Sequence, residues 1–232
     1  MANTKVKYVI GDRTFTATTF VNGISRVNIN LNPGFYLIYA VNPVTGETAV
    51  NSLFIYNRLM ENADLTQSYS QGKYYKVRAY TSSGSIAGAG QNVVFKVAGK
   101  TYNIKTDAKG YASLKVDLKP GTYAITASYG GVTVKNKITV KSIVVAKNVK
   151  VKRTAKMLKV KVSLKKVNGK YLKGKKITLK FKGKTYKAKT NKKGVATFKI
   201  KKNVIKKLKK GKKYKYTVTY LKDSVKKSLK VK

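Results

Sequence analysis

The sequence predicts an all-β fold of tandem antiparallel β-sandwich domains, of which the first is incomplete. Apolar residues alternate with polar ones over short runs, as in Val93, Phe95 and Val97. This period-two alternation is typical of strands with one buried face. Glycine-rich turns separate the runs, and the same order of runs and turns occurs three times along the 232 residues. A repeated pattern of this kind indicates a tandem array rather than one large domain.

The repeat is marked by turns at matching intervals. The sequence Gly-Lys-Thr-Tyr begins at Gly99 and again at Gly183, and a second turn glycine follows at the same interval in both copies. Near the N-terminus, Gly11 to Phe15 and Asn32 to Tyr36 restate the turns in weaker form. The glycines expected to hold turns are Gly99, Gly110, Gly121, Gly183 and Gly194.

Residues 1–57 are predicted to be the C-terminal half of a sandwich. The stretch that precedes Val93 in the second repeat has almost no counterpart before Val6. Half a sandwich exposes a sheet face and strand edges, which is unstable in isolation. Two interpretations stay open, a piece of a longer protein or a domain completed by a strand from another chain. The expected strand faces are Val27, Ile29 and Leu31; Tyr36, Ile38 and Ala40; and Leu53 with Ile55.

Residues 58–141 are predicted to form a complete sandwich. A linker and first strand are expected in 57–64, and a Gly- and Ser-rich loop in 81–91. Tyr123 follows a Pro-Gly turn, as does the tyrosine that pins a sandwich corner through its hydroxyl, and the alternative is a large core side chain. The other strands are expected at 74–80, 93–98, 101–106, 111–118, 122–129 and 132–140.

Residues 142–232 are predicted to be a third, lysine-rich sandwich. Leu158, Val160 and Val162 alternate with lysine and serine, and the same code recurs at 177–181 and 196–200. A disordered basic tail would have lost this period, so the unit is expected to fold with its lysines outward. The main departure is the insertion 201–210. Its apolar residues are spaced for one amphipathic helical turn that caps the sandwich: Val204, Ile205 and Leu208.

Charge is concentrated in the third unit. The net charge is +45, divided as +2 in residues 1–57, +9 in 58–141 and +34 in 142–232. Five of the 52 basic residues are arginine, and lysine lacks the planar fork that reads bases or carboxylates, so bulk attraction of polyanions is expected. The alternative is that the lysines form a solvated surface that only keeps the molecule soluble. The candidate polyanion-binding residues are Lys192, Lys193, Lys206, Lys207, Lys209, Lys210, Lys212 and Lys213.

Composition argues against enzymatic, metal and cofactor functions. Without Cys or His, thiol, haem and zinc-finger chemistry have no ligands. The seven acidic residues are expected in turns or on outward strand positions, including Asp223 in a turn, so neither a catalytic carboxylate pair nor a calcium site is predicted. The shortage of carboxylates also disfavours a lysine isopeptide crosslink. No apolar run is long enough to span a bilayer, and the first residues do not show the series of charged, apolar and small residues expected of a signal peptide.

The motifs resemble the Ig-like repeats of adhesin-like surface proteins of methanogenic archaea and the related bacterial Ig-like (Big) domains of invasin type. The resemblance is carried by 99–102, 106–112, 118–123 and 183–196, and it is weakest in the first unit. It implies an extracellular, cell-surface or cell-wall-associated rod, with the lysine-rich unit nearest the wall. The implied partners are an acidic wall polymer or surface glycan and surface proteins of another cell. It supplies no catalytic residue.

Three functional hypotheses follow. The first is a non-enzymatic adhesin-like protein whose repeats form a stalk and whose third unit holds an acidic cell-wall polymer, with 201–213 as the densest contact. The second is a polyanion- or nucleic-acid-binding basic protein, which predicts a large salt dependence of duplex binding. The third is a carbohydrate-binding module that uses the 81–91 loop, for which glycan binding would be insensitive to salt.

Overall fold

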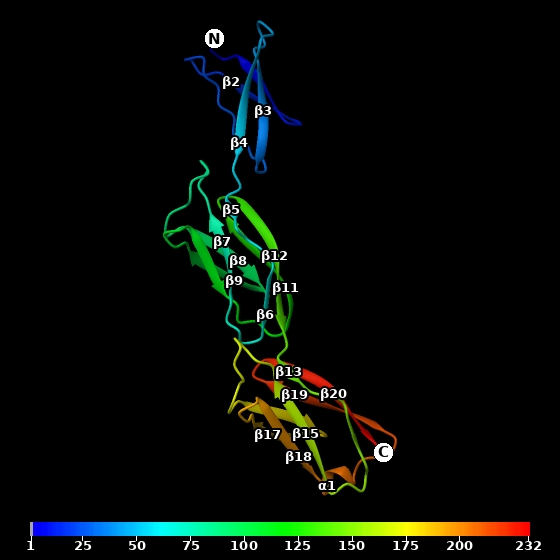
Figure 1. The fold of residues 1–232 in the computed structure, drawn as a ribbon. Helices are drawn as coiled ribbons and strands as arrows, with labels where there is room; N and C mark the ends of the chain where they lie inside the picture. Colours follow the sequence, from blue (N-terminus) through cyan, green and yellow to red (C-terminus); the bar gives the residue numbers. More distant parts are fainter. Residues whose placement is uncertain (1) are drawn as a thin grey trace.

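The computed structural model describes residues 2–232 and confirms the predicted all-β class. Figure 1 shows three units arranged in a line, from the N-terminal unit in blue to the C-terminal unit in orange and red. Among the described residues, every strand pairs with strands of its own unit. The lysine-rich unit therefore lies at one end of an elongated molecule.

The first unit is one four-stranded sheet in the order β2-β1-β3-β4. Its antiparallel strands are β1 (Lys5–Ile10), β2 (Arg13–Thr18), β3 (Gly34–Val41) and β4 (Thr48–Ile55). The strand predicted from Val27, Ile29 and Leu31 is wrong. These side chains are half-buried, but no described strand pairs with residues 24–33. The alternating pattern is present, and the hydrogen-bonded neighbour that would make it a strand is absent.

The second unit is a sandwich of two sheets. One has the order β6-β12-β11-β8-β9 and the other β10-β7-β5. Tyr75 and Phe95 meet edge to face across the core, with ring centroids 5.8 Å apart. The strands are β5 (Leu59–Met60), β6 (Leu65–Ser68), β7 (Tyr74–Ala79), β8 (Asn92–Val97), β9 (Lys100–Lys105), β10 (Tyr111–Lys115), β11 (Gly121–Tyr129) and β12 (Val132–Lys141).

The third unit repeats this plan, with sheets in the order β14-β20-β19-β16-β17 and β13-β15-β18. The 201–210 insertion contains the helix α1 (Lys202–Ile205), which contacts β15 and β18. Ile205 and Leu208 are buried, so the predicted amphipathic cap is confirmed. The strands are β13 (Val144–Val145), β14 (Val149–Val151), β15 (Met157–Leu164), β16 (Lys176–Phe181), β17 (Lys184–Lys189), β18 (Val195–Lys201), β19 (Lys213–Tyr220) and β20 (Asp223–Val231).

Two details of pairing differ from the sequence-based expectation. The edge strands β6 and β14 run parallel to β12 and β20, so the sheets are not wholly antiparallel. The first-unit turn is also shifted by one residue. Gly11 follows the last paired residue of β1, as Ala98 follows that of β8, so Gly11 is the counterpart of Ala98 and not of Gly99. Both adopt positive φ, 60° at Gly11 and 50° at Ala98.

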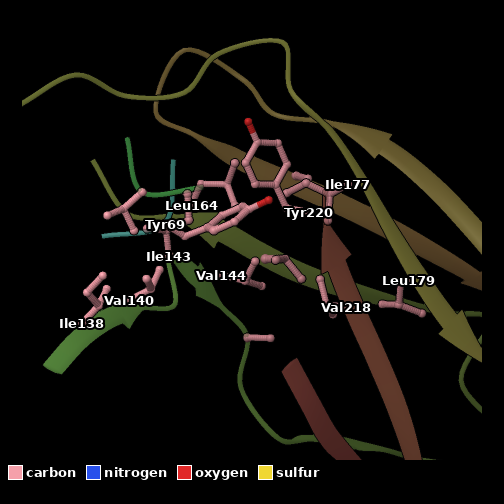
Figure 2. Close-up of a cluster of buried hydrophobic side chains, with 14 of the residues drawn as sticks. Tyr69, Ile138, Val140, Ile143, Val144, Leu164, Ile177, Leu179, Val218 and Tyr220 are labelled. Atoms are coloured by element: carbon pink, nitrogen blue, oxygen red, sulfur yellow. The ribbon is translucent and has the colours of Figure 1, made fainter. Parts of the chain in front are cut away.

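The second and third units share a packed junction. Tyr69 and Tyr220 meet edge to face with ring centroids 6.4 Å apart, and Figure 2 shows them within a cluster of buried side chains drawn from both units. The backbone N–H of Lys222 donates to the Tyr69 hydroxyl at 3.0 Å, and the Lys222 ammonium pairs with Asp117 at 3.0 Å. Apolar packing and polar contacts thus fix the β19–β20 turn of the third unit against the second unit.

Candidate functional site

The strand code places lysines on the outside of the third unit. Along β15, Leu158, Val160 and Val162 are buried and the lysines between them are exposed. β18 shows the same alternation, with buried Ala196, Phe198 and Ile200. Successive side chains of a strand point to opposite faces. A well-packed apolar core therefore holds the lysines in a fixed, outward array.

Several outward lysines directly face one another across neighbouring strands. Lys159 of β15 lies opposite Lys199 of β18. Two further opposed pairs are Lys176 with Lys189 and Lys213 with Lys230. Like charges directly opposite each other destabilise a sheet, by the same order as the roughly 0.2–1 kcal/mol that a favourable cross-strand pair contributes. An anion lying over such a pair would offset this repulsion.

The densest lysine cluster surrounds α1 at the end of the third unit far from the second (Figure 1). Hydrogen bonds to the backbone fix this segment: the Arg153 side chain donates to the Lys206 carbonyl at 3.2 Å, and the Lys209 N–H donates to the Tyr214 hydroxyl at 2.8 Å. The cluster, here called the distal lysine cluster, consists of exposed Lys202, Lys206, Lys207, Lys209, Lys210, Lys212 and Lys213.

Two hollows open beside the distal lysine cluster. One, of about 180 Å³, has an apolar wall from Val204 and Leu208 and a cationic rim from Lys182, Lys184 and Lys207. The other, of about 550 Å³, is lined by Arg153, Thr154, Lys202 and Lys206. Convergent cations around shallow hollows attract anionic groups without reading their detailed shape.

The structure separates Lys192 and Lys193 from this cluster. They occupy the turn between β17 and β18, and β18 runs from that turn to α1. A strand of this length spans about 20 Å. The Gly194 that closes the turn donates its N–H to the Asn191 carbonyl at 2.9 Å, and its carbonyl accepts from Leu164 at 2.9 Å. The eight candidate lysines therefore form two groups at opposite ends of the unit.

The predicted structural residues lie at turns and at the sandwich corner. Gly99 and Gly183 lie in the β8–β9 and β16–β17 hairpins, and Gly121 opens β11. Gly110 has a φ of +78°, and a Cβ there would lie 2.7 Å from Ile86 and 3.0 Å from the Ala79 carbonyl oxygen. Only glycine meets both constraints without strain.

Tyr123 makes the corner contact. Its hydroxyl donates to the Lys119 carbonyl four residues upstream at 2.9 Å. Tyr36 makes the same contact in the first unit, with the Asn32 carbonyl at 2.9 Å. In the third unit the insertion reverses the direction, and the Tyr214 hydroxyl accepts from Lys209. The tyrosine thus closes the same corner three times with different partners.

Asp223 was expected in a turn, among acidic residues predicted to lie in turns or on outward strand positions. It does end the turn between β19 and β20, but its side chain points inward. It is the first residue of β20, is fully buried, and accepts hydrogen bonds from Ser142, Ile143 and Val144. Its position as the single acidic residue after Asp117 was the only feature of the sequence that set it apart. The burial of Asp223 could not be predicted from the sequence, because its hydrogen-bond donors come from a segment about eighty residues away.

Glu61 is the centre of a second polar cluster that the sequence did not indicate. Arg78 pairs with it at 2.7 Å, and the Tyr80 and Tyr111 hydroxyls donate to it at 3.1 and 2.5 Å. The Tyr111 hydrogen bond, followed by that of Arg78, holds the pKa of Glu61 below its usual value. The guanidinium of Arg78 also lies 5.0 Å from the centre of the Tyr111 ring. All three donors bond Glu61, so the cluster braces the first-unit end of the second sandwich.

In the 81–91 loop, several polar groups form hydrogen bonds within the loop itself. The Thr81 hydroxyl contacts the Ser83 hydroxyl at 2.8 Å and the Ser85 carbonyl at 3.3 Å.

Within residues 2–232 no three His, Cys, Asp or Glu side chains gather as a metal site would require. Over the same residues no helix is both long and apolar enough to cross a bilayer.

No protein-family model and no curated protein matches the sequence. Solved structures show only distant similarity. A Ca²⁺-stabilised adhesin with which an Antarctic bacterium binds ice is 18% identical, with a TM-score of 0.24, and the alignment covers 100% of this chain and 66% of that one. A tandem segment of titin is 13% identical, with a TM-score of 0.39 and coverages of 99% and 89%.

The N-terminal Ig domains of the Down syndrome cell adhesion molecule are also similar, at 14% identity and a TM-score of 0.30. There the alignment covers 98% of this chain and 31% of that chain. Similarities at this level assign no ligand, partner or activity.

Proposed function

We propose that this chain is a non-enzymatic, adhesin-like protein of the cell surface, in which the third unit associates with an acidic cell-wall polymer. The first two units serve as stalk and adhesion modules in this proposal. The in-line arrangement of the units (Figure 1) supports a stalk. The charge distribution supports the polymer contact, since +34 of the +45 net charge belongs to residues 142–232.

The single observation that carries the proposal is the set of opposed lysine pairs on a folded surface. Lys159 faces Lys199 although the neighbouring Lys161 faces Thr197, a pairing without repulsion. Lysines kept opposite one another at a cost in stability support a role in contacting an extended anion. The distal lysine cluster adds the highest local charge and lies at the tip of the molecule.

The test compares binding of the full chain to isolated cell envelope, to polygalacturonate and to duplex DNA over a salt series. Charge reversal of Lys206, Lys207, Lys209 and Lys210 to glutamate is expected to abolish envelope binding. A matched control reverses four exposed lysines elsewhere, with the same change in net charge, and is expected to retain most binding: Lys96, Lys100, Lys105 and Lys135.

The outcomes separate the hypotheses. Envelope binding that persists near physiological salt while DNA is released supports the wall contact. Equal and steeply salt-dependent binding to all three probes identifies a general polycation, since counterion release then supplies all the affinity. If the reversed variant binds envelope as well as the native chain does, the proposal fails.

A further inference from the structure

The sheet of the first unit matches one sheet of each sandwich, strand by strand. β2, β1, β3 and β4 occupy the places of β9, β8, β11 and β12, and of β17, β16, β19 and β20. The register agrees as well, because Tyr36 faces Leu53 as Tyr123 faces Ile138 and as Tyr214 faces Leu229. The first unit is therefore the same sheet without its edge strand and without the opposing sheet.

The face that would meet the opposing sheet is built as a core. Tyr8, Ile38 and Leu53 stand where the second unit has Phe95, Ile125 and Ile138. The second-unit residues are 0% exposed, whereas their first-unit counterparts are only half-buried. Apolar side chains on this face have kept the pattern of a buried surface without the partner that would bury them.

A cavity of about 730 Å³ opens on this face, lined by Val6, Thr19, Ala40 and Ala49 among others. At the same end of the second sandwich, β5 contacts β11 and β12, and its Leu59 is 0% exposed. The third unit fills this layer with β13, β15 and β18. The cavity is thus the space that a second layer occupies in both complete units.

Besides the cavity, a second unfilled position lies beside residues 24–33, where no described strand pairs with this segment. Val27 stands six residues before Pro33 as Leu114 of β10 stands six residues before Pro120, so this segment is the counterpart of β10 in sequence. In the second unit, β10 pairs with β7. In that pairing Leu114 faces Tyr75, whose hydroxyl donates to Asn136 at 2.5 Å. The first unit retains an asparagine at the equivalent site. Asn51 faces Ile38 as Asn136 faces Ile125, and it is exposed.

The third unfilled position is the outer edge of β4, which pairs with no described strand. In the second unit β6 runs parallel to β12 beside Ile138 and Val140, and in the third β14 runs parallel to β20 beside Leu229 and Val231. The equivalent residues of β4 are Leu53 and Ile55, and no described strand lies along them. An edge of this kind presents unpaired backbone groups and is a template for strand addition.

We propose that the first unit is an acceptor for an extended polypeptide segment from outside residues 1–232. The segment supplies one strand parallel to β4 and, after a turn, one strand antiparallel to residues 24–31. Its alternate residues are apolar and fill the cavity, and a hydroxyl-bearing side chain reaches Asn51. The segment comes from outside this chain because the described strands of the other units are all paired within those units.

Strand binding by the first unit does not depend on polymer binding by the third, since the first unit carries a net charge of only +2. The second and third units, in which these positions are filled, indicate the chemistry of the occupant. β6 and β7 provide the pattern most directly, in the segment Leu65–Ala79, where Tyr75, Val77 and Ala79 point into the core.

The test adds a synthetic Leu65–Ala79 peptide to the full chain and follows amide hydrogen exchange. The expected result is slower exchange in 24–31 and along β4, with no change in the third unit. A control peptide with Tyr75→Lys and Val77→Lys is expected to leave exchange unchanged, because it places two charges against the apolar face. Peptide that merely replaces β6 and β7 of the second unit would give no protection in 24–31, and that result would overturn the proposal.

A pair of matched substitutions tests the Asn51 contact. Tyr75→Phe in the peptide and Asn51→Ala in the chain each weaken binding by a factor of about two to ten, the effect of one hydrogen bond. The two together are expected to weaken binding no more than either alone. Asn51 is exposed, so its removal leaves the fold intact. Protection of 24–31 that rises with protein concentration alone, together with dimers in sedimentation, would instead make a second copy the occupant and would refute the proposal.

Discussion

The carboxylate of Asp223 accepts a hydrogen bond from the backbone N–H of Ile143 at 2.8 Å. The same oxygen accepts from Val144 at 3.1 Å, and the other accepts from the Ser142 hydroxyl at 2.8 Å. One buried side chain thereby ties the first residues of the third unit to the turn between β19 and β20. That turn also carries Lys222, which pairs with Asp117 of the second unit.

Replacing Asp223 should strongly destabilise the third unit. Asp223→Ala leaves the buried backbone N–H of Ile143 without its acceptor and leaves that of Val144 with only the Ser142 hydroxyl at 3.3 Å. We expect a loss of about 3 kcal/mol in the free energy of unfolding of the third unit. Asp223→Asn keeps one acceptor oxygen and should lose less. Ser142→Ala, which removes one donor, should cost about 1 kcal/mol. Urea unfolding followed by a probe in the third unit measures all three. An unchanged midpoint for Asp223→Ala would show that water replaces the carboxylate.

Glu61 should make the second unit sensitive to acid. Because its pKa is lowered in the folded protein, chiefly by the Tyr111 hydroxyl and then by Arg78, its stabilising effect is complete above the unfolded value of about 4.3. The effect is lost as the pH falls below that value through the folded pKa. Glu61→Gln should therefore be less stable at neutral pH and lose less stability on acidification. Thermal melting of both proteins between pH 7 and pH 3 is the measurement. Parallel curves would exclude Glu61 as the titrating group.

Relieving one lysine pair should stabilise the third unit. Lys199→Thr removes the repulsion with Lys159, and we expect a gain of about 0.5 kcal/mol at low ionic strength. The gain should shrink as salt is added, since mobile ions screen exposed charges over about 10 Å at 0.1 M. Lys201→Thr is the control. It removes the same charge opposite Met157 instead of a lysine, so it should gain less. Equal gains in both variants would assign the effect to net charge.

Local patterns predicted much of the fold. Period-two alternation located β8 to β12, β15, β16 and β18, and the spacing of Val204, Ile205 and Leu208 located the cap around α1. These features depend on neighbouring residues along the chain. The prediction of a strand at Val27 to Leu31 was wrong because a strand also needs a hydrogen-bonded partner. The sequence of the segment alone cannot show whether such a partner is present.

The candidate site was less accessible to sequence reasoning. Lys193 and Lys206 are thirteen positions apart in sequence, yet β18 carries the chain from one end of the unit to the other between them. Topology, and not sequence distance, decides which lysines share a surface. The burial of Asp223 likewise depends on the approach of Ser142 to Val144, which no local pattern records.

The gradient of charge along the three aligned units has a consequence for how the molecule meets a surface. An elongated body whose charge is gathered at one tip has a large electric dipole about its centre of mass, so the field near an anionic surface exerts a torque on it. The lysine-rich tip turns inward before contact, and the nearly neutral first unit is left pointing into solvent. Since screening restricts this field to about 8 Å at physiological ionic strength, the alignment happens within the last nanometre of approach.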